Sequence, residues 1–306
     1  MDWNRVKSIF IYILIAINIG LLALNYKEGQ KYTLTSEQEK AVYELLSNNN
    51  IGIYTNLIKK FSPMRQLAVT TPVFDNDSIR SVFFDPNEEI KITVDFDQTV
   101  FKSESKTVTL YGNVLVFECP NGTGIIENFT KKDSAEFAQS FINNLTFESK
   151  NNIKLEKVSE YENGYLVEFN ELYGKNSVFC SSREVYITEK GIISMRAEFY
   201  NIEGYTGEKR QICSCDEALL TVLYDIKNNY NEMPTGTYIE KIELGYDLQV
   251  QSDISQISTL KLVPCYRIFI SGFDKPFIVD AYTNEITEIK DSAFIQDEAQ
   301  NENSSV

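Results

Sequence analysis

The sequence lacks histidine altogether, since none occurs among its 306 residues. Histidine is the commonest general base near neutral pH, and it activates the nucleophile in Ser-His-Asp and Cys-His enzymes. It is also a frequent zinc ligand. Its absence excludes these catalytic systems and every zinc site that contains histidine.

Positive charge is scarce as well. The chain has 29 Lys and Arg against 44 Asp and Glu, which gives a net charge of −15. A domain with this balance repels phosphate backbones and anionic lipid surfaces, so we expect no nucleic-acid partner. Hydrophobic residues make up 43% of the chain, which is enough to form a real core.

Motifs that carry chemistry are also missing. There is no G-x-S-x-G elbow, and the glycine-rich stretch Asn121–Gly124 lacks the Lys-Ser/Thr of a phosphate loop, which leaves a turn as its role. Asp75, Asp77 and Ser78 resemble the start of a calcium loop, but Ile79 occupies the third ligand position, so a polar loop is the better interpretation. We therefore predict no catalytic residue, no metal site, no cofactor and no small-molecule substrate.

The five cysteines form an odd set, so at least one thiol is free or pairs between chains. Cys213 and Cys215 are too close for a zinc knuckle and poorly placed to bridge each other. Cys119, Cys180 and Cys265 lie in apolar, strand-like surroundings and are expected as small core residues.

One long apolar run does occur, from Ile9 to Leu24. About 16 helical residues at 1.5 Å each span roughly 24 Å, and the flanks bring the helix to about the thickness of a bilayer. Trp3 and Tyr26 suit anchors at the two membrane interfaces. A cleaved signal peptide is the alternative, but Leu21–Asn25 offers no good small-x-small cleavage site. We predict a retained transmembrane helix at residues 9–26.

Arg5 and Lys7 stand on the short leading side of this run. Basic residues favour the cytoplasmic side of a membrane. The prediction is a single-pass protein of the cell membrane, with residues 1–8 in the cytoplasm and the bulk of the chain outside.

Two faces of the predicted span suit contacts with other helices. Ala16, Gly20 and Ala23 fall on one stripe of small residues, which lets another helix approach closely. Asn18 sits about 200° away around the helix, and an amide at that depth is stabilised by a polar partner on another helix. These four residues are the predicted protein-interaction site.

The remaining sequence predicts an α+β fold, with units in which a helix is followed by an antiparallel meander. Three helices are expected from capping pairs at their starts, namely Ser36 with Glu39, Asp133 with Glu136, and Ser214 with Glu217. The predicted divisions are a linker at 27–34, a first α+β region at 35–130, a second at 131–290 and a disordered tail at 291–306.

Strands are expected where Val, Ile, Tyr and Phe gather between turn residues. The predicted strands are 66–70, 90–94, 108–111, 114–118, 153–158, 165–170, 178–188, 192–200, 237–250, 260–271, 276–282 and 285–289.

Both ends of the chain resemble a known family. The opening Met1–Ile11 (MDWNRVKSIFI) with Asn18–Leu22 (NIGLL), and the ending Leu262–Ile268 (LVPCYRI) with Ile278–Ile286 (IVDAYTNEI), resemble the YycI family of low-GC Gram-positive bacteria. The ending also resembles the closing strand and Asp-Ala-x-Thr-Gly turn of PepSY-type domains. Asn284 stands where such a turn has glycine, and asparagine tolerates the left-handed conformation expected there.

The resemblance implies an auxiliary regulator of the WalK/WalR (YycG/YycF) two-component system. Such a protein would be a membrane-embedded non-enzyme whose partners are the sensor histidine kinase and a YycH-like protein. Two alternatives stay open. One is a PepSY-like extracytoplasmic module that inhibits a peptidase or binds a cell-wall component. The other is a membrane-anchored hydrolase that uses paired carboxylates.

Overall fold

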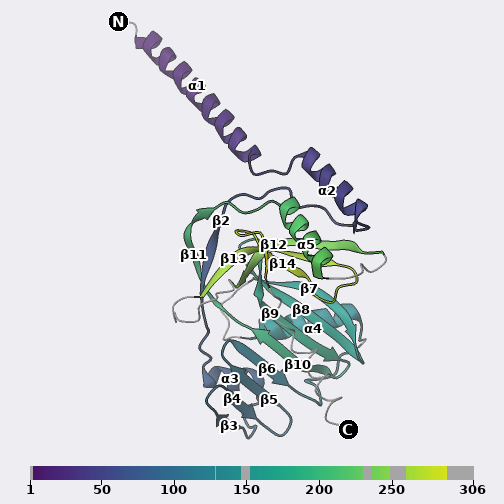
Figure 1. Ribbon diagram of the computed structural model, residues 1–306. Helices are drawn as coiled ribbons and strands as arrows, with labels where there is room; N and C mark the ends of the chain where they lie inside the picture. The colour runs from purple at the N-terminus through teal and green to yellow at the C-terminus, as the bar shows by residue number, and fades with distance from the viewer. Residues whose placement is uncertain (1–2, 128, 146–151, 230–235, 249–259, 288–306) are drawn as a thin grey trace. The chain divides into compact units, whose positions relative to one another are not determined.

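The chain folds as two units, each assembled from segments that lie far apart in the sequence. The structure is a computed structural model that describes residues 3–127, 129–145, 152–229, 236–248 and 260–287 (Figure 1). Unit 1 comprises Met1–Arg65, Glu208–Glu243 and Pro264–Val306, and unit 2 comprises Gln66–Gly207 and Leu244–Val263. Four strands run from one unit into the other: β2 (Met64–Thr70), β11 (Asn201–Arg210), β12 (Tyr238–Leu248) and β13 (Leu260–Ile270).

Unit 1 places helices on a small sheet. Its remaining elements are α1 (Trp3–Gln30), α2 (Ser36–Asn48), β1 (Gly52–Ile53), α5 (Cys215–Asn229), β14 (Phe277–Asp280) and β15 (Glu285–Thr287). The strand order is β1-β12-β13-β14-β15, with β1 parallel to β12 and the pairs β13-β14 and β14-β15 antiparallel. Helix α5 packs against α2, β14 and β15.

Helix α5 forms where the sequence predicts it. The backbone N–H of Ser214 donates to Glu217 Oε2 at 2.7 Å, and the Ser214 hydroxyl donates to the same oxygen at 3.0 Å. Its buried apolar residues recur every three or four positions: Ala218, Leu219, Val222, Leu223 and Ile226. Because burying a Leu, Ile or Val side chain contributes about 1.5–3 kcal/mol, this face holds the helix on its neighbours.

Unit 2 is an antiparallel sheet with helices packed on it. Its strands are β3 (Lys91–Val94), β4 (Thr99–Lys102), β5 (Thr107–Tyr111), β6 (Val114–Glu118), β7 (Asn152–Tyr161), β8 (Gly164–Tyr173), β9 (Asn176–Thr188) and β10 (Gly191–Glu198). They lie in the order β7-β8-β9-β10-β6-β5-β4-β3, and every neighbouring pair is antiparallel. Helix α4 (Lys131–Asn143) contacts β7, β8 and β9, and α3 (Asn76–Phe83) supplies further core residues.

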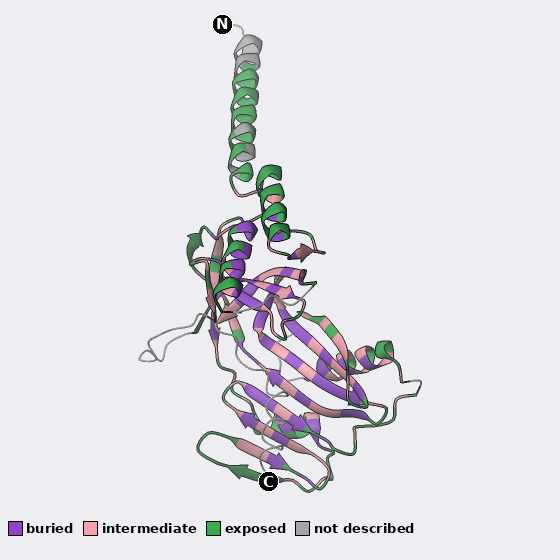
Figure 2. Ribbon diagram, turned by 45° about the vertical axis from the view of Figure 1, so that its right-hand side comes forward, coloured by how far each residue is buried: buried purple, intermediate pink, exposed green. Residues whose placement is uncertain are grey.

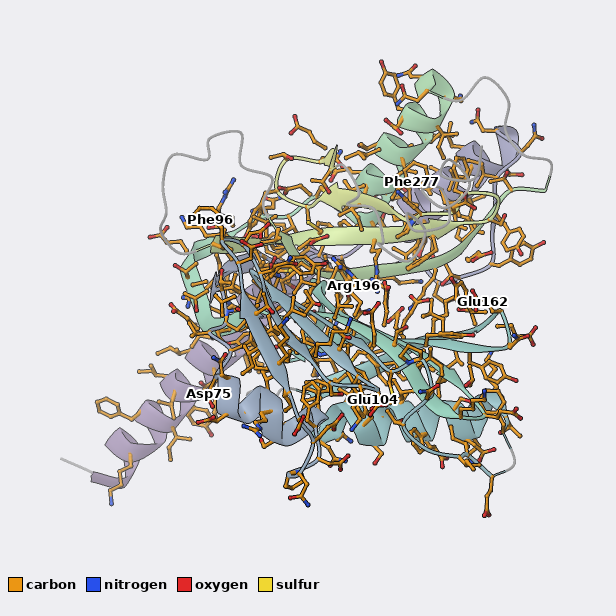
Figure 3. The ribbon with its side chains drawn as sticks, turned by 90° about the horizontal axis from the view of Figure 1, so that it is seen from below. Asp75, Phe96, Glu104, Glu162, Arg196 and Phe277 are labelled. Atoms are coloured by element: carbon orange, nitrogen blue, oxygen red, sulfur yellow. The ribbon has the colours of Figure 1, made fainter. Side chains whose placement is uncertain are left out.

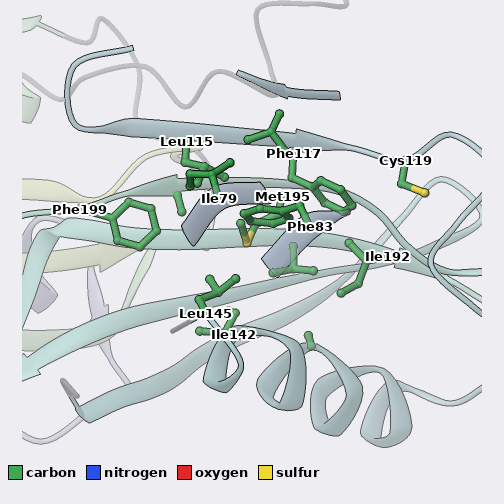
Figure 4. Packing of buried hydrophobic residues seen from close by; sticks show 14 of the residues in the cluster. Ile79, Phe83, Leu115, Phe117, Cys119, Ile142, Leu145, Ile192, Met195 and Phe199 are labelled. Carbon is green, nitrogen blue, oxygen red and sulfur yellow. The ribbon is translucent and has the colours of Figure 1, made fainter. Parts of the chain in front are cut away.

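The core of unit 2 joins residues from both sides of position 130. Figure 4 shows Leu115 and Phe117 of β6, Met195 of β10 and Ile142 of α4 within one buried cluster. The predicted division between residues 35–130 and 131–290 therefore falls inside unit 2. Strands before it and the helix after it bury a common apolar face.

The α+β class is confirmed, and a helix followed by antiparallel strands occurs twice, as α4 with β7–β10 and as α5 with β12–β15. Each predicted strand corresponds to an observed one, although several ends differ by one to three residues. Strands β1, β4 and β11 and helix α3 were not predicted. Strand β11 contains two glycines and mostly polar residues, so it carries no alternating apolar signal.

Two of the predicted helix starts are wrong in position. Helix α2 is capped by Thr35, whose side chain accepts from the Gln38 N–H, rather than by Ser36 with Glu39. Helix α4 is capped by Thr130 rather than Asp133, and the Asp133 N–H donates to Thr130 Oγ1 at 3.2 Å. Both threonines have the extended backbone of an N-cap.

Asp75 is likewise a helix cap and not part of a polar loop. Its carboxylate accepts from the Ser78 N–H at 2.9 Å and thereby opens α3. Hydrogen bonds from the Ser78 side chain and backbone lower the pKa of Asp75 below its usual value. The partial resemblance to a calcium loop is thus explained by helix capping.

The glycine-rich stretch before α4 packs backbone to backbone against the β9-β10 turn. Gly124 N–H donates to the Lys190 carbonyl at 3.1 Å. A Cβ on Gly122 would lie 2.0 Å from the Lys190 carbonyl oxygen, and one on Gly191 would lie 2.6 Å from that of Gly124. Both glycines also have positive φ, so the predicted turn role of Asn121–Gly124 is confirmed.

A buried ion pair lies inside unit 2, between Arg183 on β9 and Glu171 on β8. The Arg183 Nη2 atom is 3.4 Å from Glu171 Oε2, and both side chains are 1% exposed. Ser181 Oγ donates to the same carboxylate at 2.6 Å. The Arg183 guanidinium also stacks over the Phe199 ring, 4.9 Å from its centroid. The pair is stabilising only while both charges remain, because either one alone would be buried without its counter-ion.

We predict that Arg183→Met lowers the free energy of unfolding by about 3–5 kcal/mol, because it removes the positive charge that faces the buried Glu171 carboxylate. The double variant Arg183→Met/Glu171→Leu should recover most of this loss, and Ser181 keeps the Glu198 carbonyl as an acceptor at 3.2 Å. Urea unfolding followed by circular dichroism measures both. A double variant as unstable as the single one would contradict the assignment.

Candidate functional site

The described residues offer little apparatus for catalysis. Among them, no group of three or more Cys, Asp or Glu side chains is placed to hold a metal ion. An open hollow of about 690 Å³ lies between α2 and β1, lined by residues that include Tyr43, Glu44, Ser47 and Ile53. Glu44 is the one carboxylate on its wall, so no acid and base pair converges there.

Cys213 and Cys215 are not suited to supply a thiolate. None of the five cysteines, all within the described residues, forms a disulfide in the chain. Burial raises the pKa of Cys213 to about 12 and that of Cys215 to about 11. Cysteine nucleophiles need a lowered pKa, so these thiols stay protonated and behave as core residues. Cys119 and Cys265 are buried, as predicted, whereas Cys180 is half-buried.

One carboxyl group in unit 2 has a strongly raised pKa. Glu184 on β9 stands between Glu168 on β8 and Arg196 on β10 in the sheet register. Burial and the adjacent Glu168 charge raise its pKa to about 7, with Glu198 adding to the rise and Arg196 opposing it. Arg196, labelled in Figure 3, is held by Tyr111 and by Glu198 at 3.1 Å. Glu184 does not line the hollow described above.

Helix α1 has apolar side chains that no other part of the described chain covers. Where they are described, its apolar side chains are exposed, for example Phe10 at 68%, Leu14 at 63% and Leu22 at 68%. Figure 2 shows the helix in the colour of exposed residues wherever its side chains are described. A large exposed apolar surface marks an interaction site with protein or membrane.

The predicted contact residues lie on α1. Ala16, Asn18 and Gly20 are exposed, and a Cβ built on Gly20 would meet nothing within 4 Å. The Asn18 side chain forms no hydrogen bond with any residue that the structure describes. The side chain of Ala23 lies outside the described residues.

The predicted interface anchors fall near the ends of the same helix. Lys7 is exposed. Trp3, Arg5 and Tyr26 belong to α1 by backbone, but their side chains lie outside the described residues. Among the described residues, which omit several side chains of α1, no helix is both long and apolar enough to count as a membrane span.

The segment predicted as a linker, residues 27–34, is ordered. Helix α1 continues through Gln30, and Thr33 then pairs with Lys60. The Leu34 N–H donates to the Lys59 carbonyl at 2.7 Å, and the Phe61 N–H donates to the Tyr32 carbonyl at 3.1 Å. Leu34 is buried. The helix is therefore joined to the rest of unit 1 by a short hydrogen-bonded ribbon.

The residues of the ending motif have structural partners. Tyr266 is fully buried and donates its hydroxyl to the Cys213 carbonyl at 2.9 Å. Arg267 Nη2 is 2.6 Å from Glu243 Oε2 on β12. Burial alone would raise the pKa of Glu243, but Arg267 and Lys241 lower it to about 2. This motif therefore ties β13 to β12 and to the start of α5.

The turn between β14 and β15, at residues 281–284, is stabilised by hydrogen bonds to the Asp280 carboxylate. Asp280 Oδ1 accepts from the backbone N–H groups of Tyr282, at 2.7 Å, and Thr283, at 3.3 Å. Asn284 has a φ of 58°, which confirms the left-handed position predicted there.

The ribbon at residues 32–34 was not predicted from the sequence, since a two-strand contact between residues this close to a helix end has no periodic pattern.

Comparisons with known proteins bear on the family and the fold. The family model described as YycI protein matches residues 29–282. No curated protein matches the chain. An uncharacterized protein from Eubacterium rectale has a similar structure, with 12% identity and a TM-score of 0.51 over 78% of this chain and 89% of that one. The YpeB C-terminal domain of Bacillus megaterium aligns with 14% identity and a TM-score of 0.43 over 71% of this chain and 97% of that one.

The raised pKa of Glu184 makes stability depend on pH. Its usual pKa of 4.5 in the unfolded chain rises to about 7 on folding, so the native state keeps a proton that the unfolded state releases. Stability is therefore full below about pH 4.5 and falls as the pH rises toward 7. We predict that Glu184→Gln raises the unfolding free energy at pH 8 by about 1–3 kcal/mol and changes little at pH 4.5. Thermal melts at the two pH values test this, and an equal shift at both would contradict it.

Proposed function

The chain belongs to the YycI family, and from that membership we propose that it is a membrane-anchored, non-enzymatic regulator of a sensor histidine kinase. The family consists of auxiliary regulators associated with a histidine kinase complex. For this chain we propose a WalK/YycG-like kinase and a YycH-like protein as the partners. The match covers residues 29–282 and so includes the closing motif Leu262–Ile268, whereas the opening motif Met1–Leu22 lies before it.

The exposed apolar surface of α1 is the observation that supports this proposal most strongly. Residues 8–26 carry no charged side chain, and at 1.5 Å each they span about 29 Å, close to the hydrocarbon thickness of a bilayer. We propose that residues 9–26 cross the membrane, with Arg5 and Lys7 on the cytoplasmic side. Trp3 and Tyr26 then lie at the two interfaces, and the bulk of the chain is extracytoplasmic.

Regulation in this proposal needs no chemistry. A helix that binds one conformational state of a kinase more tightly than the other shifts the equilibrium by the difference in affinity. The stripe of Ala16, Gly20 and Ala23 allows close approach of a partner helix, while Asn18 offers an amide on another face. The ribbon at residues 32–34 would pass displacements between α1 and the rest of unit 1, since few residues lie between the helix and the ribbon.

We predict that Asn18→Leu and Gly20→Ile each weaken association of the full chain with the kinase or the YycH-like protein. Loss of one such contact costs about 1 kcal/mol, or roughly fivefold in affinity. A bacterial membrane two-hybrid assay gives the readout. Ile17→Leu is the matched control, because it keeps an apolar side chain of similar size on the same helix.

Unchanged association in both variants would contradict the helix-pairing proposal. A second chain in which residues 3–26 are replaced by an unrelated span separates the alternatives. Control of the kinase should be lost with the new span. Full retention would favour the other candidate, a PepSY-like outer module that inhibits a peptidase or binds a cell-wall component.

A further inference from the structure

Strand β3 forms an open edge of the unit 2 sheet. It pairs with β4, from Lys91 opposite Lys102 to Val94 opposite Thr99, and no other strand among the described residues pairs with it. All four of its residues are exposed, as the colouring in Figure 2 shows. The open edge of a strand presents unpaired backbone groups that can pair with another strand.

One face of this edge is apolar. Ile92, Val94 and Phe96 follow at alternate positions and are 44%, 72% and 104% exposed; Phe96 is labelled in Figure 3. Ile92 stands opposite Phe101, which is fully buried. At the open edge of the sheet, Ile92 and Val94 therefore lie on the same face as the core of unit 2.

The turn that ends β3 shows which backbone groups are unpaired. The Asp95 N–H donates to the Gln98 carbonyl at 2.8 Å. Along an antiparallel pair, residues that exchange hydrogen bonds alternate with residues that do not. Asp95 is a hydrogen-bonded position. Thr93 and Lys91, two and four residues before it, are therefore hydrogen-bonded positions as well and direct their backbone groups toward β4. The N–H and C=O groups of Ile92 and Val94 consequently point away from the sheet.

The other face of the edge carries charges of both signs. Lys91 and Asp95 lie two residues on either side of Thr93. Lys91 stands directly opposite Lys102, and like charges in that position are destabilising. One oxygen of Asp95 accepts from the Phe96 N–H at 2.9 Å, which leaves its second oxygen able to accept from a cation.

We propose that β3 pairs with β3 of a second copy of this chain, antiparallel and about a two-fold axis through Thr93. In this register Lys91 of each copy lies opposite Asp95 of the other, which forms two ion pairs and offsets the Lys91–Lys102 repulsion. Ile92 lies opposite Val94 in both directions, so their outward backbone groups exchange hydrogen bonds. Such an interface is isologous, as a dimer with two-fold symmetry requires.

Other registers are less favourable. A shift by one position along the pair places the outward groups of Ile92 opposite the inward groups of Thr93, so the hydrogen bonds cannot form. Centring on Ile92 brings Glu89 of one copy opposite Asp95 of the other, which is repulsive. Centring on Val94 places Lys91 opposite Asp97, which lies in the turn.

A cysteine at the axis tests the proposal directly. In the predicted register the two Thr93 residues form a non-hydrogen-bonded pair, whose Cα atoms are about 4.5 Å apart and within disulfide range. Thr93→Cys is introduced into the purified full chain in detergent, with the native cysteines kept and copper phenanthroline as the oxidant. Thr109→Cys is the matched control, because Thr109 lies in the same cross-strand row of the same face but on the interior strand β5. We expect at least tenfold more disulfide-linked dimer from Thr93→Cys.

Charge reversal tests the identity of the partner. Lys91→Asp and Asp95→Lys are introduced separately into the Thr93→Cys chain. Each should reduce the amount of disulfide-linked dimer at least threefold. An equal mixture of the two chains should restore it as a mixed dimer, because each copy then presents the charge that the other lacks. The reduction should shrink at high salt, since these pairs are exposed.

Two results would overturn the proposal. One is equal cross-linking at Thr93→Cys and Thr109→Cys. The other is a Thr93→Cys dimer that the mixed charge variants fail to restore. Thermal melts of each variant confirm that the chain is folded, which is expected because Lys91, Thr93 and Asp95 are exposed. In cell membranes, a Thr93→Cys adduct with a different protein in place of the dimer would also reject self-pairing.

Discussion

Helix α1 carries an apolar surface that the rest of the described chain leaves uncovered, and the function proposed for the protein depends on this surface. The side chains from Phe10 to Leu22 are exposed where they are described, while both folded units bury a core of apolar side chains and expose others, such as Val94 and Phe96. Apolar area left in water is unfavourable at about 25 cal/mol per Å². A bilayer and partner helices would remove that area from water, and for this reason the regulatory contact is proposed there.

The two folded units are stabilised in different ways. Unit 2 buries one face of an antiparallel sheet against α4 and α3, and it also encloses the Arg183–Glu171 pair. Unit 1 has a smaller sheet whose strands are tied by Arg267 with Glu243 and by the Asp280 turn. The residues that resemble the family at the end of the chain therefore maintain the fold. The contacts proposed with other proteins and with a second copy of the chain lie instead on exposed elements, namely α1 and the edge strand β3.

The sequence predicted the parts of the fold whose signal is local. Helix α5 follows from a Ser214–Glu217 pair and a regular apolar stripe, and Asn284 follows from its tolerance of positive φ. Thr35 and Thr130 were missed as caps because another polar residue with a Glu three positions later stands just downstream of each. Strand β4 is four residues long, which is too short for a clear alternation.

What could not be predicted depends on contacts between distant segments. The grouping of residues 66–207 with 244–263 is set by strand pairing across long separations, and no local pattern reports it. Arg183 resembles a surface residue in the sequence, since burial of a charge becomes visible only with its partner in place. The candidate site residues on α1 were predicted from the small residues and the asparagine within the apolar run, and the structure adds the ribbon that joins the helix to the rest of unit 1.

The most direct test of the membrane-contact account is photo-cross-linking from position 20 of α1 in intact cells. A photoreactive residue replaces Gly20 in the full chain, and the adducts are identified by mass spectrometry. The account predicts adducts with membrane-spanning segments of the sensor kinase or of a YycH-like protein. Recovery of a mature chain that begins after residue 26, or of lipid adducts alone, would contradict it.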